Sequence, residues 1–325
     1  MSKLFKSPKL VIWMVTYNHE KYIEQAVESI MAQQTNFDFQ LFIGEDCSTD
    51  NTRNICLELK NKYPDAIKLV LNNKNIGSNK NGMSMYDLCY KSNAKYIALC
   101  EGDDYWTDSF KLQKQVDFLE ANPDYEVCFT NINIINDKGE ETKEQLITTS
   151  PKTTYTQKDL PLRVPTLTRV FKNRDFSNLQ IAPGMDTIIL LYQAQFGKIK
   201  YIDEITGTYR QHDSGAYTSK SKAKRKEHNF LTLFGCLQLL KPPLLYKYYG
   251  MLFKKLVELK RLNSALFKKR QSQLKKEYKS KKSSFSKKEQ RNIAIGFLLL
   301  KTPFFEHSKL LSKVILILLN RKFIY

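Results

Sequence analysis

The sequence predicts an α/β protein with a mostly parallel sheet flanked by helices, followed by a basic amphipathic helical tail. Short apolar runs alternate with helically periodic segments up to residue 104, as in parallel sheets covered on both faces. The charge is also divided. Residues 1–218 hold 25 basic and 28 acidic side chains, a net charge of −3, whereas residues 219–325 hold 27 and 5, a net charge of +22. We therefore expect one domain over residues 1–218 and a separate region over 219–325.

Four apolar runs predict buried strands, and a polar segment follows each of them. The runs are 10–15, 39–43, 67–71 and 96–100. Apolar residues recur at helical spacing over 22–31, 51–62 and 85–90. Ligands bind beyond the carboxyl ends of strands in such sheets. The polar residues that follow the strands are therefore the first candidates for a site.

The alternation loosens after residue 104. We expect a helix over 112–121, a strand over 125–135, a polar loop region over 137–180, a helix over 184–197 and a strand over 199–205. In the tail, five leucines share roughly one helical face and lysines flank them, and apolar bursts follow. The leucines are Leu252, Leu256, Leu259, Leu262 and Leu266, and the bursts are 293–300 and 314–319.

Composition excludes several classes of protein. With 42% hydrophobic and 26% charged residues, the 325-residue chain is typical of folded rather than disordered proteins. None of the six cysteines forms a C-x-x-C pair, which argues against a zinc site. The residues after Met1 lack a secretory apolar segment, and no stretch is long and apolar enough for a conventional transmembrane helix. These features predict that the protein is located in the reducing cytoplasm.

The acidic tetrad Glu101-Gly102-Asp103-Asp104 follows the fourth predicted strand. Carboxylates this close repel one another, and a hard divalent cation with oxygen ligands relieves the repulsion. Gly102 would let a ligand approach the backbone. The alternative is an acidic turn in which Asp104 caps the next helix.

Further candidates follow the other strands. Glu45 and Asp46 could accept hydrogen bonds from a ribose or a base ring, or belong to an N-cap cluster. The loop holding Asn81 could approach a ligand closely or form a plain tight turn. Asp186 could be a general base or an acid that favours a helix start. His212 could bind metal or phosphate, or be a surface histidine.

The order of these segments resembles family 2 glycosyltransferases, which have the GT-A nucleotide-diphospho-sugar transferase fold. The resemblance covers roughly residues 8–218 and is specific as a set. Its segments are VTYNHEKYIEQAVESIMAQ, EDCSTDNT, ALCEGDDYW and GMDTIILLYQAQFGKIKYIDEITGTYRQHDSG. Glu101 replaces the first Asp of the family's D-x-D-D segment, and Met185 replaces one acid of its acceptor-side pair.

The resemblance implies a role for each matching residue. The implied donor-nucleotide site comprises Thr16, Asn18, Glu45, Asp46, Asn81, Glu101, Gly102, Asp103 and Arg210. The implied ligands of Mg²⁺ or Mn²⁺ are Asp103, Asp104 and His212, and Asp186 matches the catalytic base. A metal and a nearby cation neutralise a leaving diphosphate, and a carboxylate can deprotonate the attacking hydroxyl.

These observations predict a glycosyltransferase that acts in bacterial surface-polysaccharide synthesis. We expect it to move a sugar from a UDP-sugar to a glycan or polyprenyl-linked acceptor. The resemblance also implies inversion. The alternatives are a nucleotidyltransferase on a related fold and a degenerate carbohydrate- or partner-binding module. The basic tail with apolar bursts favours an anionic membrane surface over a solvated helical tail, and both of these over nucleic acid. We therefore expect a peripheral place on the inner face of the plasma membrane. A homo-oligomer interface is a further alternative for its apolar face.

Overall fold

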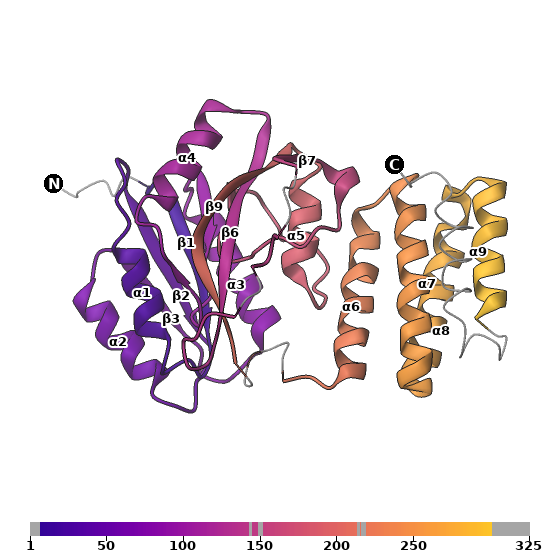
Figure 1. The fold of residues 1–325 in the computed structure, drawn as a ribbon, viewed down its shortest axis with the longest axis horizontal. Helices are drawn as coiled ribbons and strands as arrows, with labels where there is room; N and C mark the ends of the chain where they lie inside the picture. Colours follow the sequence, from indigo (N-terminus) through magenta and orange to yellow (C-terminus); the bar gives the residue numbers. More distant parts are fainter. Residues whose placement is uncertain (1–6, 143–144, 149–151, 213–214, 216–218, 301–325) are drawn as a thin grey trace. The chain divides into compact units, whose positions relative to one another are not determined.

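The computed structural model describes residues 7–142, 145–148, 152–212, 215 and 219–300. The chain divides into two compact units. The first comprises residues 1–181 and 189–218, and the second comprises 182–188 and 219–325. Figure 1 follows both units along the chain.

The first unit contains the sheet. Its strands are β1 (Leu10–Thr16), β2 (Phe39–Glu45), β3 (Ile67–Leu71), β4 (Tyr96–Leu99), β5 (Tyr105–Trp106), β6 (Tyr125–Asn136), β7 (Thr154–Tyr155), β8 (Val170–Lys172) and β9 (Lys198–Gln211). Its helices are α1 (Ile23–Met31), α2 (Thr52–Lys62), α3 (Ser78–Lys91) and α4 (Lys111–Ala121), with a 3-10 turn at Gln157–Asp159. Helix α5 (Met185–Gln193) is shared between the two units.

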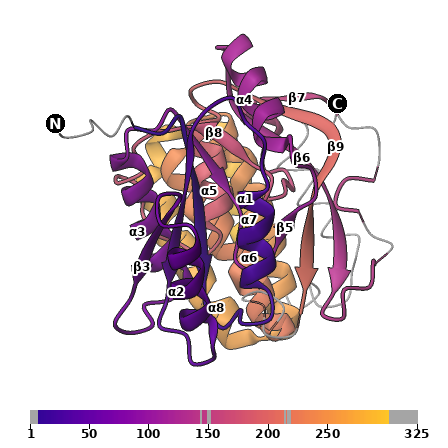
Figure 2. The same cartoon turned by 90° about the vertical axis from the view of Figure 1, so that its left-hand side faces the viewer.

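The strand order is β3-β2-β1-β4-β8-β6-β9-β5, and β7 also pairs with β9. The first four strands are parallel, as the alternating sequence pattern predicts. Beyond β4 the sheet is mixed, because β8 lies antiparallel to both β4 and β6 while β9 runs parallel to β6. Figure 2 shows these strands from the side of α1 and α2.

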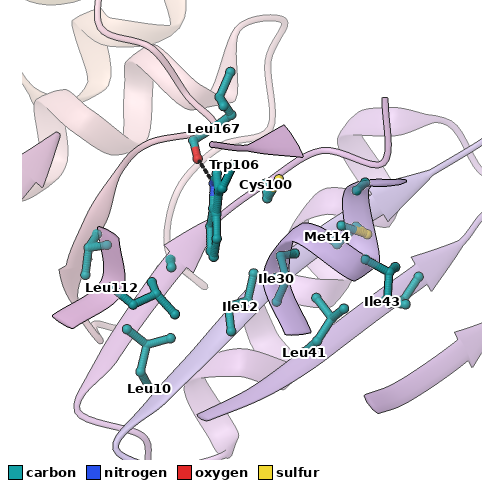
Figure 3. Packing of buried hydrophobic residues seen from close by; sticks show 14 of the residues in the cluster. Leu10, Ile12, Met14, Ile30, Leu41, Ile43, Cys100, Trp106, Leu112 and Leu167 are labelled. Atoms are coloured by element: carbon teal, nitrogen blue, oxygen red, sulfur yellow. Dashed lines mark hydrogen bonds between the residues drawn. The ribbon is translucent and has the colours of Figure 1, made fainter. Parts of the chain in front are cut away.

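The main core lies between the sheet and the helices α1, α2 and α4. Alternate β1 residues Leu10, Ile12 and Met14 face it, whereas Trp13 faces α3 and stacks on Tyr86 at 5.1 Å. Figure 3 shows Leu10, Ile12 and Met14 in this core, together with the hydrogen bond from Trp106 Nε1 to the Leu167 carbonyl. That bond is 2.7 Å long. The continuous apolar run of β1 is explained by burial on both faces.

The second unit is helical. It contains α6 (Lys222–Cys236), α7 (Leu244–Leu262), α8 (Ser264–Lys281) and α9 (Lys287–Leu299), with 3-10 turns at Leu237–Leu239 and Lys282–Ser284. The expected single leucine face over 252–266 is wrong, because Asn263 ends α7 and caps α8 through its side chain. Among the described residues, none of the helices combines the length and apolar character needed to cross a bilayer.

The apolar residues of these helices mostly form the unit's own core. Leu252, Leu256, Leu259 and Ile293 are fully buried. Leu262 and Leu298 are exceptions, with 39% and 62% of their surface exposed. The apolar burst at 314–319 lies outside the described residues.

Candidate functional site

The polar segments that follow β1, β2 and β4 lie side by side at the carboxyl edge of the sheet. Thr16 and Glu45 are register partners at the ends of β1 and β2. The backbone N–H of Asp46 donates to the Thr16 carbonyl at 3.1 Å, and that of Gly102 donates to the Val15 carbonyl at 3.1 Å. Three candidate segments therefore converge, as expected for a parallel sheet.

Asn18 connects the first two loops. Its backbone is left-handed, with φ 56°, a conformation that asparagine tolerates better than most residues. Its side-chain oxygen accepts from the Thr49 N–H at 2.9 Å, and its own N–H donates to Ser48 Oγ at 3.0 Å. These bonds fix the loop after β1 against the loop after β2.

Glu45 is buried, and both of its carboxylate oxygens have protein partners. Oε1 accepts from the Ser48 N–H at 2.6 Å, and Oε2 pairs with the guanidinium of Arg53. Arg53 also donates to the Asn72 carbonyl. The carboxylate thus holds the start of α2 and the loop after β3 in place.

Asp46 is also buried and organises the loop before α3. Its Oδ1 accepts from Asn72 Nδ2 and from the Ile76 N–H, both at 2.9 Å, and Oδ2 accepts from the Gly77 N–H at 2.9 Å. The prediction of a loop around Asn81 is wrong, because this residue lies in α3, where it is buried and its side-chain amide donates to the Gly44 carbonyl at 2.9 Å. Both side chains act on the protein backbone in this structure.

Thr16 and Gly102 pack against each other. A Cβ on Gly102 would lie 2.8 Å from Thr16 Oγ1 and 3.0 Å from Ile23 Cδ1, so this position needs glycine for packing. The space beside the Gly102 Cα where a Cβ would lie is thus filled by side chains, and the approach of a ligand to its backbone stays a prediction. Thr16 is 2% exposed, and its Oγ1 has no hydrogen-bond partner among the described residues.

Asp103, His19 and His212 form a cluster of potential metal ligands. Asp103 Oδ2 lies 3.1 Å from His212 Nε2 and 3.6 Å from His19 Nε2. One nitrogen or oxygen atom from each residue lies within 4.8 Å of the other two. Asp103 comes from the turn between β4 and β5, His212 directly follows β9, and His19 lies between β1 and α1.

The electrostatics of this cluster favour a charged carboxylate and a neutral imidazole. Burial alone would raise the pKa of Asp103, but His19 and His212 hold it below its ordinary value. Burial lowers the pKa of His19, which Asp103 only partly opposes. A carboxylate and a neutral imidazole are the forms that bind metal ions.

Asp104 lies outside this cluster, although the sequence groups it with Asp103 and His212. Its Oδ1 accepts from the backbone N–H of Arg210 at 2.9 Å. Burial, together with the neighbouring Asp103 and the half-buried Glu101, raises the pKa of Asp104 well above its ordinary value. The residue therefore joins the acidic turn to β9, and it caps no helix.

Arg210 is held in one position beside the cluster. Its Nη2 donates to Gln25 Oε1 at 2.7 Å, and its Nε donates to the Asp103 carbonyl at 3.3 Å. Its guanidinium lies over the ring of Tyr22 at 4.6 Å. A permanent positive charge thus lies next to Asp103.

Asp186 belongs to the second unit, where it occupies the first turn of α5 and is exposed. Gly184, two residues before Asp186, has φ 74°, and a Cβ there would collide with the side chain of Thr232. Asp186 acts electrostatically on His228, although burial is the larger effect and lowers the pKa of that histidine. Its assignment as a base stays a prediction.

His19 is the residue that the sequence analysis missed. It follows the first strand closely and lies at the edge that also carries Asp103. Its position just after a strand end is the one feature of the sequence that could have marked it as a site residue. A lone histidine in a polar loop has no periodic or paired pattern to mark it.

A model of the family described as Glycosyl transferase family 2 matches residues 11–178. An uncharacterized protein of Mycobacterium tuberculosis is 32% identical over 222 residues, which cover 65% of this chain and 61% of the relative. The dTDP-rhamnosyl transferase RfbG of Shigella flexneri is 37% identical over 110 residues, or 34% of this chain and 37% of the relative. The chain thus spans less than two thirds of the length of these relatives.

Solved glycosyltransferase structures share the fold. The S. aureus TarS structure in complex with UDP-GlcNAc aligns with 95% of this chain and 87% of its own, at a TM-score of 0.58 and 16% identity. The mannosyltransferase PcManGT from Pyrobaculum calidifontis, in complex with GDP-Man and Mn²⁺, covers 98% and 87%, at a TM-score of 0.53 and 13% identity. At these identities the likeness concerns the fold alone.

Proposed function

The chain belongs to glycosyl transferase family 2, and from this premise we propose that it transfers a sugar from a nucleotide-diphospho-sugar to a hydroxyl group of a glycan or polyprenyl-linked acceptor. We propose a UDP-sugar as donor and surface-polysaccharide synthesis as the setting. Relatives named for rhamnosyl transfer and for teichuronic acid biosynthesis support that setting. The reaction proposed is inverting, as the family resemblance implies.

The convergence of Asp103, His212 and Arg210 carries this proposal. Breaking a sugar–diphosphate bond leaves a diphosphate whose charge must be neutralised. One carboxylate with adjacent imidazole nitrogens is a suitable donor set for a divalent ion such as Mn²⁺, so the residues present fit the metal that the family implies. When bound, the ion would supply positive charge to the diphosphate. Arg210 adds a fixed cation beside it.

We assign the remaining donor contacts to the same edge of the sheet. Thr16 offers a buried, unpartnered hydroxyl, which a donor could satisfy. Asn18 and Glu101 border the same edge. Glu45, Asp46 and Asn81 would act by shaping the nucleotide loops, because the protein backbone already uses their side chains.

We propose Asp186 as the base that takes the proton of the acceptor hydroxyl. It is an exposed carboxylate at a helix start, and Met185 beside it cannot share that role. A single carboxylate is sufficient for this chemistry.

We propose that the basic second unit binds an anionic membrane surface. Because its leucines are mostly buried in its own core, the attraction would come from lysines rather than from inserted apolar side chains. Replacing the exposed Lys268, Lys269, Lys276 and Lys279 by glutamine in the full chain should reduce sedimentation with phosphatidylglycerol vesicles. The matched control replaces four exposed lysines of the first unit: Lys62, Lys74, Lys91 and Lys138. Equal loss in both variants would contradict this assignment.

A screen of nucleotide sugars with Mn²⁺ tests the enzymatic proposal. Donor hydrolysis and thermal shift are measured for the wild type and for Asp103→Asn, with Asp87→Asn, an exposed acid on α3, as control. We expect one donor to stabilise and be hydrolysed by the wild type and the control, and hydrolysis by Asp103→Asn to fall at least 100-fold. Absence of a response to any UDP-, GDP- or dTDP-sugar would overturn the proposal. Binding without turnover or transfer would favour a carbohydrate-binding module instead.

A further inference from the structure

We propose that His19 is a third protein ligand of the metal, and that the resulting two-imidazole, one-carboxylate site selects a divalent transition metal over Mg²⁺. This inference rests on the proposed metal-dependent transfer. His19 lies outside the acidic turn that carries Asp103 and outside the segment around Arg210.

The spacing of the three side chains fits a common ion. Ligands about 2.1 Å from an octahedral ion lie roughly 3.0 Å apart when adjacent and about 4.2 Å apart when opposite. The observed separations from Asp103 Oδ2 are 3.1 Å to His212 Nε2 and 3.6 Å to His19 Nε2. All three ligand atoms lie within 4.8 Å of one another, so changes of about 0.6 Å or less in these separations would place the two imidazoles opposite each other on one ion with the carboxylate adjacent to both.

The backbone of His19 is anchored, whereas its imidazole makes no hydrogen bond among the described residues. The His19 N–H donates to Thr52 Oγ1 at 2.8 Å, and its carbonyl accepts from the N–H groups of Tyr22 and Ile23. The side chain is only 15% exposed, yet Nδ1 has no hydrogen-bond partner among the described residues. The 3.6 Å from Nε2 to Asp103 is also longer than a hydrogen bond. Nε2, the nitrogen that faces Asp103, is therefore free to coordinate an ion.

The chemistry of the donor set determines which ion it prefers. Mg²⁺ favours oxygen ligands and retains its waters, whereas imidazole suits transition metals. Three protein ligands also leave coordination positions open, which phosphate oxygens of a nucleoside diphosphate can fill. Asp104 is not part of this set, and its Oδ1 accepts from the backbone N–H of Arg210.

Electron spin-echo spectroscopy of Mn²⁺ bound to the full chain in the presence of UDP tests the proposal directly, because it detects coordinated imidazole nitrogen. The wild type should show two coupled imidazoles, and His19→Ala and His19→Gln should each show one. His228→Ala is the matched control and should retain both, because His228 is not a member of the cluster of potential ligands. Calorimetry should show Mn²⁺ affinity at least tenfold weaker in both His19 variants, and Mg²⁺ affinity at least tenfold below that of Mn²⁺ in the wild type.

Two coupled imidazoles in either folded His19 variant, or fewer than two in the wild type, would overturn the assignment of His19. Equal affinity of the wild type for Mg²⁺ and Mn²⁺ would overturn the selectivity. The proposed function would survive both results if donor hydrolysis still required a divalent ion. It would fail separately if the wild type hydrolysed no nucleotide sugar with either ion.

Discussion

The carboxylate of Asp104 accepts a hydrogen bond from the backbone N–H of Arg210 at 2.9 Å, across 106 positions of the sequence. This bond joins the turn that carries Asp103 to the strand end that carries His212. Because β5 is only two residues long and pairs with β9 just beyond this point, the bond extends a short ladder. It thereby fixes two candidate metal ligands that come from distant segments.

Asp104→Ala should destabilise the protein, whereas Asp104→Asn should be tolerated. Alanine leaves the buried N–H of Arg210 without an acceptor, which costs about 1–3 kcal/mol of unfolding free energy. Asparagine keeps an acceptor oxygen and avoids burying a carboxylate, so its effect should be below about 1 kcal/mol. Urea unfolding measures both variants. Loss of Mn²⁺ binding in a stable Asp104→Asn protein would show instead that Asp104 is a ligand.

Gly102→Ala should destabilise the protein through overpacking, by about 1–3 kcal/mol. The new methyl group would meet the side chains of Thr16 and Ile23. The same substitution in a Thr16→Ala background should cost less, because the atoms at 2.8 and 2.9 Å are then partly removed. A double-mutant cycle from urea unfolding measures this coupling, which should be at least about 0.5 kcal/mol. Additive effects would exclude the packing explanation.

The sequence predicts the first half of the fold well, since its strands are continuous apolar runs with polar ends. The short strands β5, β7 and β8 are not predictable in this way, because two or three residues carry no periodicity and pair only through tertiary contacts. For the same reason β9 extends to Gln211, well past the apolar segment that predicts it: its polar end is held by pairing with β6.

Some residues of the candidate site can also be predicted from the sequence, whereas the roles of others cannot. Asp103 and His212 are named from sequence as metal ligands, and the structure brings them together. Gly102 also has a packing role that the sequence does not reveal, because Thr16 lies against it. Whether a carboxylate such as Asp46 faces a ligand or its own backbone depends on the loop around it, which residue types do not specify.

Asp186→Asn should strongly slow sugar transfer while leaving donor and Mn²⁺ binding intact. An amide cannot accept the acceptor's proton, so kcat should fall by about 10²–10⁴. Transfer kinetics are measured with the donor found in the screen, beside nucleotide affinity from calorimetry. Asp175→Asn, at another exposed acid, is the control. Wild-type kcat in Asp186→Asn would exclude it as the base.

Lys111→Met should stabilise the protein, and the gain should grow as the pH falls from 9 toward 7. Lys111 is completely buried over the ring of Trp106, and its Nζ has no hydrogen-bond partner among the described residues. Burial lowers the pKa of this lysine to about 7, against an ordinary value near 10.4 in the unfolded chain. Between these values the unfolded chain binds one more proton than the folded protein, so acidification favours unfolding of the wild type.

The free energy of unfolding of Lys111→Met should exceed that of the wild type by a margin that depends on pH. Above pH 7 this margin should shrink by about 1.4 kcal/mol for each pH unit. Urea unfolding at pH 7.5, 8.25 and 9 measures it, and comparison with the wild type cancels the titration of the cysteines. Lys114→Met is the control on the same helix. Hydrogen bonds to Asp108 and Glu204 raise the pKa of Lys114, so it stays protonated in both states over this range. Parallel curves for the wild type and Lys111→Met would mean that the buried lysine keeps its proton, held by the face of Trp106.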